Sequence, residues 1–242
     1  MLPFVLNRSK TALLISDLQK GYCEVGGDIA KALGWDCSPL HEVCERHLSF
    51  LAEVRNLLPP EHIIWTHMEE NEETLAPNLP MDRHADFHRL CLRGTLGFDY
   101  HLVAPEPHER EILKTHLSAF HKDARVRAAG SDAFAPTDSK TEKDDPAPAL
   151  HAYLHEKGID TIAFSGVFAT RCVYANIIGG STFGYNCICL SDLVAVPRSA
   201  FFERERKAHD LTQNMLYSYP LSSQEFLSAL RPIVNCTRAE PI

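Results

Sequence analysis

The sequence predicts an α/β domain built on a mostly parallel β-sheet. Short apolar runs that read as buried strands recur along the chain, and segments with helical periodicity fall between several of them. This alternation is typical of chains in which crossover helices join parallel strands. The length of 242 residues is enough for one large domain or two small ones, so a sizeable core can form.

Five segments have the length and apolar content of buried strands. They are residues 11–16 (TALLIS), 62–66 (HIIWT), 110–115 (REILKT), 161–166 (TIAFSG) and 186–192 (NCICLSD). Because continuous apolar runs of this length suit strands covered on both faces, we expect these five to form the parallel centre of the sheet.

Four segments have the pattern of amphipathic helices. The first is predicted to begin at Ser38, whose side chain suits the N-cap position. Its residues at helical spacing are Leu40, Val43, Cys44, His47, Leu48, Leu51 and Leu58. The second, 148–158, ends in Gly158, a residue suited to the position after a helix. Residues 199–218 and 222–230 are the other two.

Two polar segments interrupt this pattern. Residues 121–148 are charged, contain three prolines and show little periodicity. An irregular stretch of this length is usually a lid or an interaction segment, or else disordered, and both interpretations stay open here. Residues 67–90 form a second polar excursion, which also follows a strand.

The composition disfavours several classes of function. A net charge of −8, without any run of five basic residues, argues against nucleic-acid binding. The N-terminal segment lacks the basic and apolar regions of a signal peptide. The uncharged stretch 172–191 contains asparagines, glycines and hydroxyl side chains that make it a poor membrane span. We therefore expect a cytoplasmic protein with no nucleic-acid or membrane partner.

The eight cysteines include no Cys-x-x-Cys pair, which disfavours a zinc ribbon or a thioredoxin motif. In a reducing compartment most cysteines are small hydrophobic residues of the core. Cys172 needs separate consideration because it lies six residues after Gly166, where a helix could begin. Its position alone leaves open whether it is a core thiol or a nucleophile.

Reactive side chains lie at the ends of three predicted strands. Asp17 follows residues 11–16, Lys114 is close to the end of the third strand, and Cys172 comes after the fourth. Parallel sheets bind ligands outside the carboxyl ends of their strands, so the three would share one rim. Singly, Asp17 could cap a turn and Lys114 could be a solvated edge residue. Together they suit a thiol nucleophile, activated by an ammonium group, with a carboxylate as general base and then general acid.

Three motifs occur in order along the chain. ALLISDLQKGYC contains a strand and an Asp-x-Gln sequence, RGTLGFDY precedes KTHLSAF, and GIDTIAFSGVFATRCVYANIIGG leads from a strand through Gly-Val to Cys-Val. Over nearly the whole chain they resemble the isochorismatase-like cysteine hydrolases. That family includes nicotinamidases, N-carbamoylsarcosine amidase, ureidoacrylate amidases and biuret hydrolases.

The resemblance implies both a fold and a catalytic mechanism. The fold would be one doubly wound domain over residues 1–242, with helices on both faces of the sheet and a polar insertion at about 121–148. Cys172 would be the nucleophile, Asp17 the proton shuttle and Lys114 the third member of a catalytic triad. The reaction would cleave a C–N bond of a small amide, carbamoyl or ureido substrate through a thioester, releasing ammonia or an amine. No cofactor is expected.

The resemblance also implies an oxyanion hole. In this family the peptide bond that corresponds to Val167–Phe168 is cis although no proline is present. It would direct the backbone amides of Phe168 and Cys172 at the substrate oxygen.

Side chains near the site give expectations about the substrate. Arg93 could clamp a substrate carboxylate with its planar guanidinium, or could form a structural salt bridge instead. The RGT segment resembles the carbamoyl- and ureido-cleaving branches, which favours a linear amide or ureide. The aromatic residues expected at the pocket are Tyr22, Phe120, Phe168 and Tyr174. Phe168 could narrow the pocket or pack under the turn that carries the cysteine.

Metal binding of the nicotinamidase type is not expected. That branch uses an Asp-Trp-His run after the second strand and a later histidine. Here the run reads WTHMEEN, with His67 and Glu70 near the expected places but without the aspartate. His84 and His88 have a spacing that can bind zinc, but no third ligand is positioned beside them.

Two other functions stay open. One is isochorismatase-type hydrolysis of a vinyl ether, in which Asp17 and Lys114 act and Cys172 is incidental. The other is a binding or scaffold protein that uses 121–148 as its contact surface, although a scaffold has no need of all three residues. Since members of the family usually assemble as dimers or tetramers, we expect a homodimer or homotetramer, with 67–90 and 121–148 at the contacts.

Overall fold

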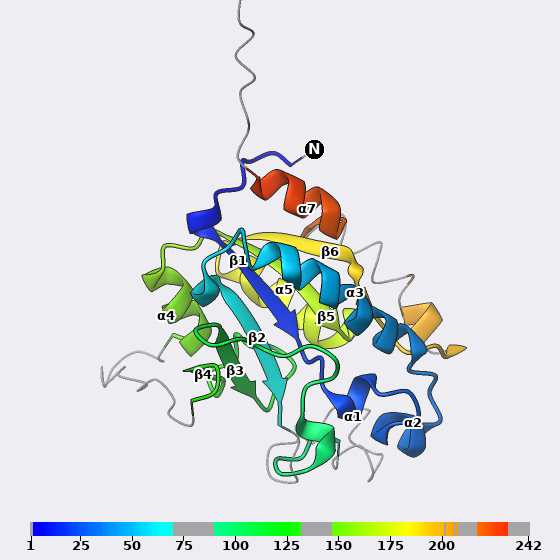
Figure 1. Ribbon diagram of the computed structural model, residues 1–242. Helices are drawn as coiled ribbons and strands as arrows, with labels where there is room; N and C mark the ends of the chain where they lie inside the picture. Colours follow the sequence, from blue (N-terminus) through cyan, green and yellow to red (C-terminus); the bar gives the residue numbers. More distant parts are fainter. Residues whose placement is uncertain are drawn as a thin grey trace, which may run out of the picture.

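The computed structural model describes residues 2–69, 90–131, 147–200, 202–205, 207 and 217–231. They form an α/β domain around a seven-stranded sheet with the order β4-β3-β2-β1-β5-β6-β7 (Figure 1). The strands are β1 (Thr11–Ser16), β2 (Ile63–Met68), β3 (Arg110–Lys114), β4 (Arg125–Ala128), β5 (Thr161–Val167), β6 (Asn186–Ala195) and β7 (Tyr219–Leu221). All neighbours pair in parallel except β3 and β4, which are antiparallel.

Helices join most of these strands. They are α1 (Lys20–Cys23), α2 (Asp28–Leu33), α3 (Ser38–Val54), α4 (Ala149–Glu156), α5 (Tyr174–Thr182) and α7 (Ser223–Leu230). Further helical turns, which are not α-helices, are η1 (Arg8–Lys10), η2 (Pro60–His62), η5 (Leu96–Phe98) and η6 (Ala169–Val173). Among the described residues, no helix is both long enough and apolar enough to cross a membrane.

The sheet has a hydrophobic core on each face, as a doubly wound arrangement requires. Alternate residues of a strand point to opposite faces. In β1, Leu13 and Ile15 belong to the core beneath α3 and α7, whereas Ala12 and Leu14 belong to the core beneath α4 and α5. Figure 1 shows α3 crossing one face of the sheet and α5 lying behind it. The prediction of helices on both faces is confirmed.

The five predicted strands are confirmed to within a few residues, but two edge strands were not predicted. Strand β4 lies inside the polar segment 121–148, where its charged sequence RVRA hid it. Strand β7 has only three residues. Both are short and mostly exposed, so neither carries the apolar run by which a central strand is found.

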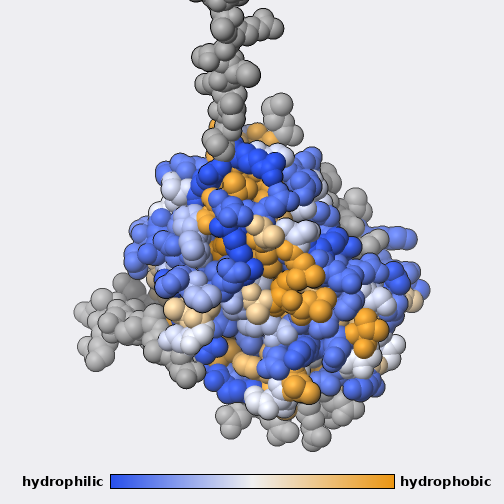
Figure 2. Space-filling model, in the orientation of Figure 1, coloured by the Kyte–Doolittle hydropathy of each residue, from blue (hydrophilic) through white to orange (hydrophobic). Residues whose placement is uncertain are grey.

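The helix predictions are largely confirmed, with corrections in α3. Ser38 is the first helical residue rather than the cap, and the side chain of Asp36 accepts a hydrogen bond from the Ser38 backbone amide at 2.9 Å. Leu48 is 52% exposed instead of buried. It lies outside the buried stripe that contains His47 and Leu51, and is one of the large hydrophobic residues exposed to solvent. Figure 2 shows one face of the molecule, on which hydrophobic residues lie among hydrophilic ones.

Other predicted segments are described only in part. Residues 202–205 and 207 are helical, in agreement with the helix predicted at 199–218. Helix α7 matches the predicted 222–230, and Gly158 follows α4 with a left-handed φ of 67°. Most of the excursion 67–90 and residues 132–146 of the predicted insertion lie outside the described residues.

Candidate active site

The three reactive side chains predicted at strand ends lie together at the carboxyl edge of the sheet. Asp17 directly follows β1, Lys114 ends β3, and Cys172 lies in η6, directly after β5. The Lys114 Nζ atom is 2.8 Å from Asp17 Oδ2 and 3.4 Å from Cys172 Sγ. All three side chains are buried. We call these residues the Asp–Lys–Cys cluster.

Lys114 is the centre of this cluster. Besides Asp17 and Cys172, its ammonium group contacts the carbonyl oxygen of His116 at 3.3 Å and the sulfur of Met68 at 3.4 Å. An ammonium group has only three protons to donate. A fully buried lysine with this many partners is held in one position, between the acid and the thiol.

The position of Asp17 is fixed by β2 and by its own backbone. The hydroxyl of Thr66 donates a hydrogen bond to Asp17 Oδ1 at 2.6 Å. The Asp17 amide donates to the Thr66 carbonyl at 3.2 Å, so side chain and backbone are both tied to β2. Asp17 has a left-handed φ of 53°, a conformation that is uncommon for a residue with a side chain.

The surroundings of the cluster raise the pKa values of both the Cys172 thiol and the Lys114 ammonium group. Burial, followed by the Asp17 carboxylate, raises the pKa of the Cys172 thiol well above its usual value, and Lys114 opposes this only in part. Burial would lower the pKa of Lys114, but Asp17 and Cys172 outweigh it and raise that pKa above its usual range. Lys114 is therefore charged, and the resting thiol keeps its proton.

The backbone that carries Cys172 makes a sharp change of direction at Gly166. This glycine has a φ of 103°, and a Cβ atom there would lie 2.2 Å from the carbonyl oxygen of Ser16. The peptide bond one residue further on, Val167–Phe168, is cis. The amides of Arg171 and Val173 then donate to the Phe168 carbonyl, which forms the helical turn that presents Cys172.

The side chain of Phe168 packs in the core. Its ring makes edge contacts with Tyr22, Trp35 and Phe202, at centroid distances of 5.6, 6.4 and 5.8 Å. Of the two options for Phe168, packing beneath the turn is the one seen. Tyr22, expected at the pocket, is part of the same aromatic group and only 6% exposed.

The other side chains predicted to bind substrate have partners within the protein. Arg93 makes a two-pronged ion pair with Glu69, at 3.0 and 3.1 Å. Phe120 lies in the core on the α5 side, where its ring approaches Gly179 and stacks with Phe183. Tyr174 is the first residue of α5 and is half-buried.

Three supporting residues had no role assigned from the sequence. They are Thr66, Gln19 and Asn176. The Gln19 side chain donates to the Met68 carbonyl and accepts from the Met68 amide, at 2.9 and 2.8 Å. Asn176 donates to the Ser16 hydroxyl and accepts from the Ala119 amide. Gln19 belongs to the Asp-x-Gln motif, which could have identified it from the sequence. The roles of Thr66 and Asn176 can be recognised only when the strand register and the position of α5 are known.

Of the histidines considered for metal binding, His67 is the one that lies within the described residues. His67 is buried, stacks on Phe98 and contacts the Phe98 carbonyl through Nε2. Glu70, His84 and His88 lie outside the described residues. Within the described residues, His116, His121 and Asp123 form a group with the composition of a metal site.

Comparisons with known proteins identify the fold. No protein-family model matches the sequence. A cysteine hydrolase from Pseudomonas syringae has a TM-score of 0.67 and 18% identity, covering 94% of this chain and 95% of that one. An isochorismatase-like hydrolase from Alkaliphilus metalliredigens has a TM-score of 0.64 and 18% identity, covering 92% and 100%. N-carbamoylsarcosine amidase from Thermoplasma acidophilum has a TM-score of 0.59 and 16% identity, covering 88% and 96%.

These similarities extend over nearly the full length of each chain. The protein therefore has the isochorismatase-like hydrolase fold, and the resemblance seen in the sequence is confirmed at the level of the fold.

Proposed function

We propose that this protein is a cysteine-dependent hydrolase that cleaves the C–N bond of a small amide, carbamoyl or ureido substrate. The observation that carries the proposal is the placement of a buried ammonium group, Lys114, within contact of both Asp17 and Cys172. A thiol, a base and a fixed cation are the parts that nucleophilic attack on a carbonyl group needs.

The first half of the reaction forms a thioester. Asp17 takes the proton of the Cys172 thiol as the sulfur attacks the substrate carbonyl carbon. The backbone amides of Phe168 and Cys172 are proposed to hold the resulting oxyanion. As the tetrahedral adduct collapses, Asp17 returns the proton to the leaving nitrogen, the C–N bond breaks, and ammonia or an amine departs.

The second half regenerates the enzyme. A water molecule loses a proton to Asp17 and attacks the thioester carbonyl. The C–S bond then breaks, and the proton returns from Asp17 to the Cys172 sulfur. Lys114 keeps its charge throughout and stabilises whichever of its two neighbours is anionic. Every proton is accounted for by side chains of the cluster, so the scheme involves no cofactor.

Two observations favour C–N hydrolysis within this fold. One structural neighbour is named as an N-carbamoylsarcosine amidase, and another as a cysteine hydrolase. Vinyl-ether hydrolysis has no use for the thiol, whereas Cys172 lies against Lys114. A small amide or ureide is the proposed substrate, and a homodimer or homotetramer the proposed assembly.

The test is ammonia release from a panel of ureidoacrylate, biuret, N-carbamoyl amino acids, nicotinamide and simple amides. Wild type is compared with Cys172→Ala and with Cys189→Ala, which removes another buried thiol. We expect release from at least one substrate, its loss in Cys172→Ala and its retention in Cys189→Ala.

The opposite outcome is equally clear. If no member of the panel releases ammonia, while isochorismate is converted by wild type and still by Cys172→Ala, the amidase proposal is wrong. The protein would then be a vinyl-ether hydrolase in which Asp17 and Lys114 act.

A further inference from the structure

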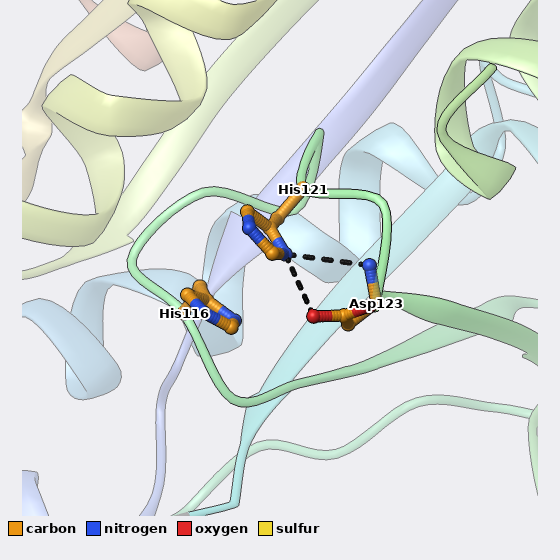
Figure 3. Close-up of side chains that lie close together, drawn as sticks. All are labelled: His116, His121 and Asp123. Carbon is orange, nitrogen blue, oxygen red and sulfur yellow. Dashed lines mark hydrogen bonds and ion pairs between the residues drawn. The ribbon is translucent and has the colours of Figure 1, made fainter. Parts of the chain in front are cut away.

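A second group of reactive side chains lies on the turn that follows β3. His116, His121 and Asp123 can each offer one ligand atom, and these atoms all lie within 4.8 Å of one another. Figure 3 shows the three side chains close together within the curve of the turn. The proposed hydrolysis uses none of them.

The contacts within the group are close. His121 Nδ1 is 3.4 Å from Asp123 Oδ2 and accepts a hydrogen bond from the Asp123 amide at 3.3 Å (Figure 3). The rings of His116 and His121 stack at a centroid distance of 3.6 Å, with their planes 16° apart. Two imidazoles and a carboxylate thus lie close enough for a small side-chain rotation to place them around one ion.

The backbone of the turn is anchored at several points. The Ala119 amide donates to the buried Asn176 side chain at 2.6 Å, and Ala119 itself is fully buried. The Ala124 amide donates to the His121 carbonyl at 3.1 Å. The His116 carbonyl accepts from Lys114 Nζ at 3.3 Å. Because the backbone is already ordered, holding the three side chains together costs less conformational entropy than it would on a free loop.

We propose that His116, His121 and Asp123 bind a divalent transition-metal ion of the Zn²⁺ type. Two imidazole nitrogens and one carboxylate oxygen suit Zn²⁺ and similar ions, and three protein ligands leave a fourth position for water. Asp123 supplies a negative charge next to the ion.

Binding requires one local adjustment. A ring nitrogen binds a metal in the plane of its ring, so two nearly parallel rings do not aim at the same point. His121 has a side chain that is 34% exposed, which leaves room for its ring to turn toward the ion. His116, also half-buried, has its Nδ1 atom 3.1 Å from the Thr115 hydroxyl, a contact that orients the ring.

The test is direct metal binding by the full chain, independent of any hydrolase activity. The protein is freed of metal with a chelator and titrated with Zn²⁺ in a calorimeter, as wild type, His121→Ala and Asp123→Asn. We expect wild type to bind one equivalent of Zn²⁺. In both variants this binding should be lost, or its affinity should fall more than about tenfold, since even the loss of an outer-shell partner lowers metal affinity by about that much. The matched control is His155→Ala, because His151 and His155 form another histidine pair, four residues apart on α4.

Co²⁺ spectra identify the ligands. A site of nitrogen and oxygen ligands gives weak visible bands that disappear in His121→Ala, whereas a strong near-ultraviolet charge-transfer band would place the ion on cysteines. Circular dichroism shows that each variant remains folded. Unchanged Zn²⁺ binding in folded His121→Ala and Asp123→Asn, or a thiolate spectrum, would overturn the proposal.

Discussion

At the level of single residues, the buried pair formed by Asp17 and Lys114 determines what the site can do. Because burial and Asp17 raise the pKa of the Cys172 thiol, the proton has to be removed as the sulfur attacks. Asp17→Asn keeps the shape of this side chain but removes the base. We expect kcat to fall by about 10²–10⁴-fold, the usual contribution of general acid–base catalysis. Steady-state kinetics on the best substrate of the panel measure this, and a loss below tenfold would exclude Asp17 as the base.

We also expect the ion pair of Asp17 and Lys114 to contribute more to the free energy of unfolding than an exposed ion pair does. Lys114→Met leaves Asp17 as a buried charge without its cation, and breaking a buried pair in this way costs about 3–5 kcal/mol of unfolding free energy. Lys20→Met removes the ion pair with Asp99. The side chains of Lys20 and Asp99 are 34% and 53% exposed, so this change should cost at most about 1 kcal/mol of unfolding free energy. Urea unfolding at neutral pH compares the two. Equal effects would show that the buried pair is not special.

At this scale the sequence predicts which residues lie near the site, but not the direction in which each side chain points. Asp17, Lys114 and Cys172 were found because strand ends converge whatever the details of packing. The direction of the Phe168 ring, toward Tyr22 and Trp35, depends on side chains from separate elements. The pairing of Arg93 with Glu69 likewise depends on tertiary contact, and the sequence left it as one of two options.

At the level of elements, β5 pairs with β1 at Gly166 in a place that leaves no room for a side chain. Gly166→Ala would place a methyl group 2.2 Å from the Ser16 carbonyl oxygen and force the two strands apart. We expect a loss of more than about 4 kcal/mol, or failure to fold. Gly184→Ala is the control, because Gly184 also has a positive φ, of 83°, but nothing within 4 Å, and should lose only about 1–2 kcal/mol. Thermal melts of the pair test this, and similar melting temperatures would contradict it.

Elements differ in how far the sequence reveals them. Strands β1 and β5 are buried along their whole length, so their composition alone identifies them. Strand β4 is held by its pairing with β3 rather than by an apolar run, and its sequence resembles a loop. The prediction that Leu48 faces the core was wrong for a related reason, since an apolar residue at an acceptable helical spacing does not have to be buried.

At the level of the whole molecule, a buried histidine makes stability depend on pH. His47 of α3 contacts the Val43 carbonyl and the Ser165 hydroxyl of β5, at 2.8 and 3.0 Å. Burial lowers its pKa from 6.5 to about 4. Between those values the unfolded chain takes up a proton that the folded protein excludes, so stability falls as the pH falls. By pH 4 the loss reaches about 3 kcal/mol.

The measurement is urea unfolding from pH 7.5 to pH 4.5 for wild type and His47→Gln. The variant should be less stable at pH 7.5 because it loses packing and a hydrogen bond, but it should lose less stability on acidification. His155→Gln, a change at an exposed position, should follow the wild-type slope. Parallel curves for wild type and His47→Gln would rule out this source of acid sensitivity.

Among the residues that the structure describes, the sheet ends on one side at β7, and this has a consequence for contacts with other chains. An uncovered strand offers its backbone as a template on which a foreign strand can grow, the usual route to unwanted fibres. Strand β7 has three residues, and its central residue, Pro220, has no amide hydrogen. Proline in an edge strand faces its missing donor outward, so this border gives an incoming strand little to bind. Pairing of two copies edge to edge through β7 is thereby disfavoured.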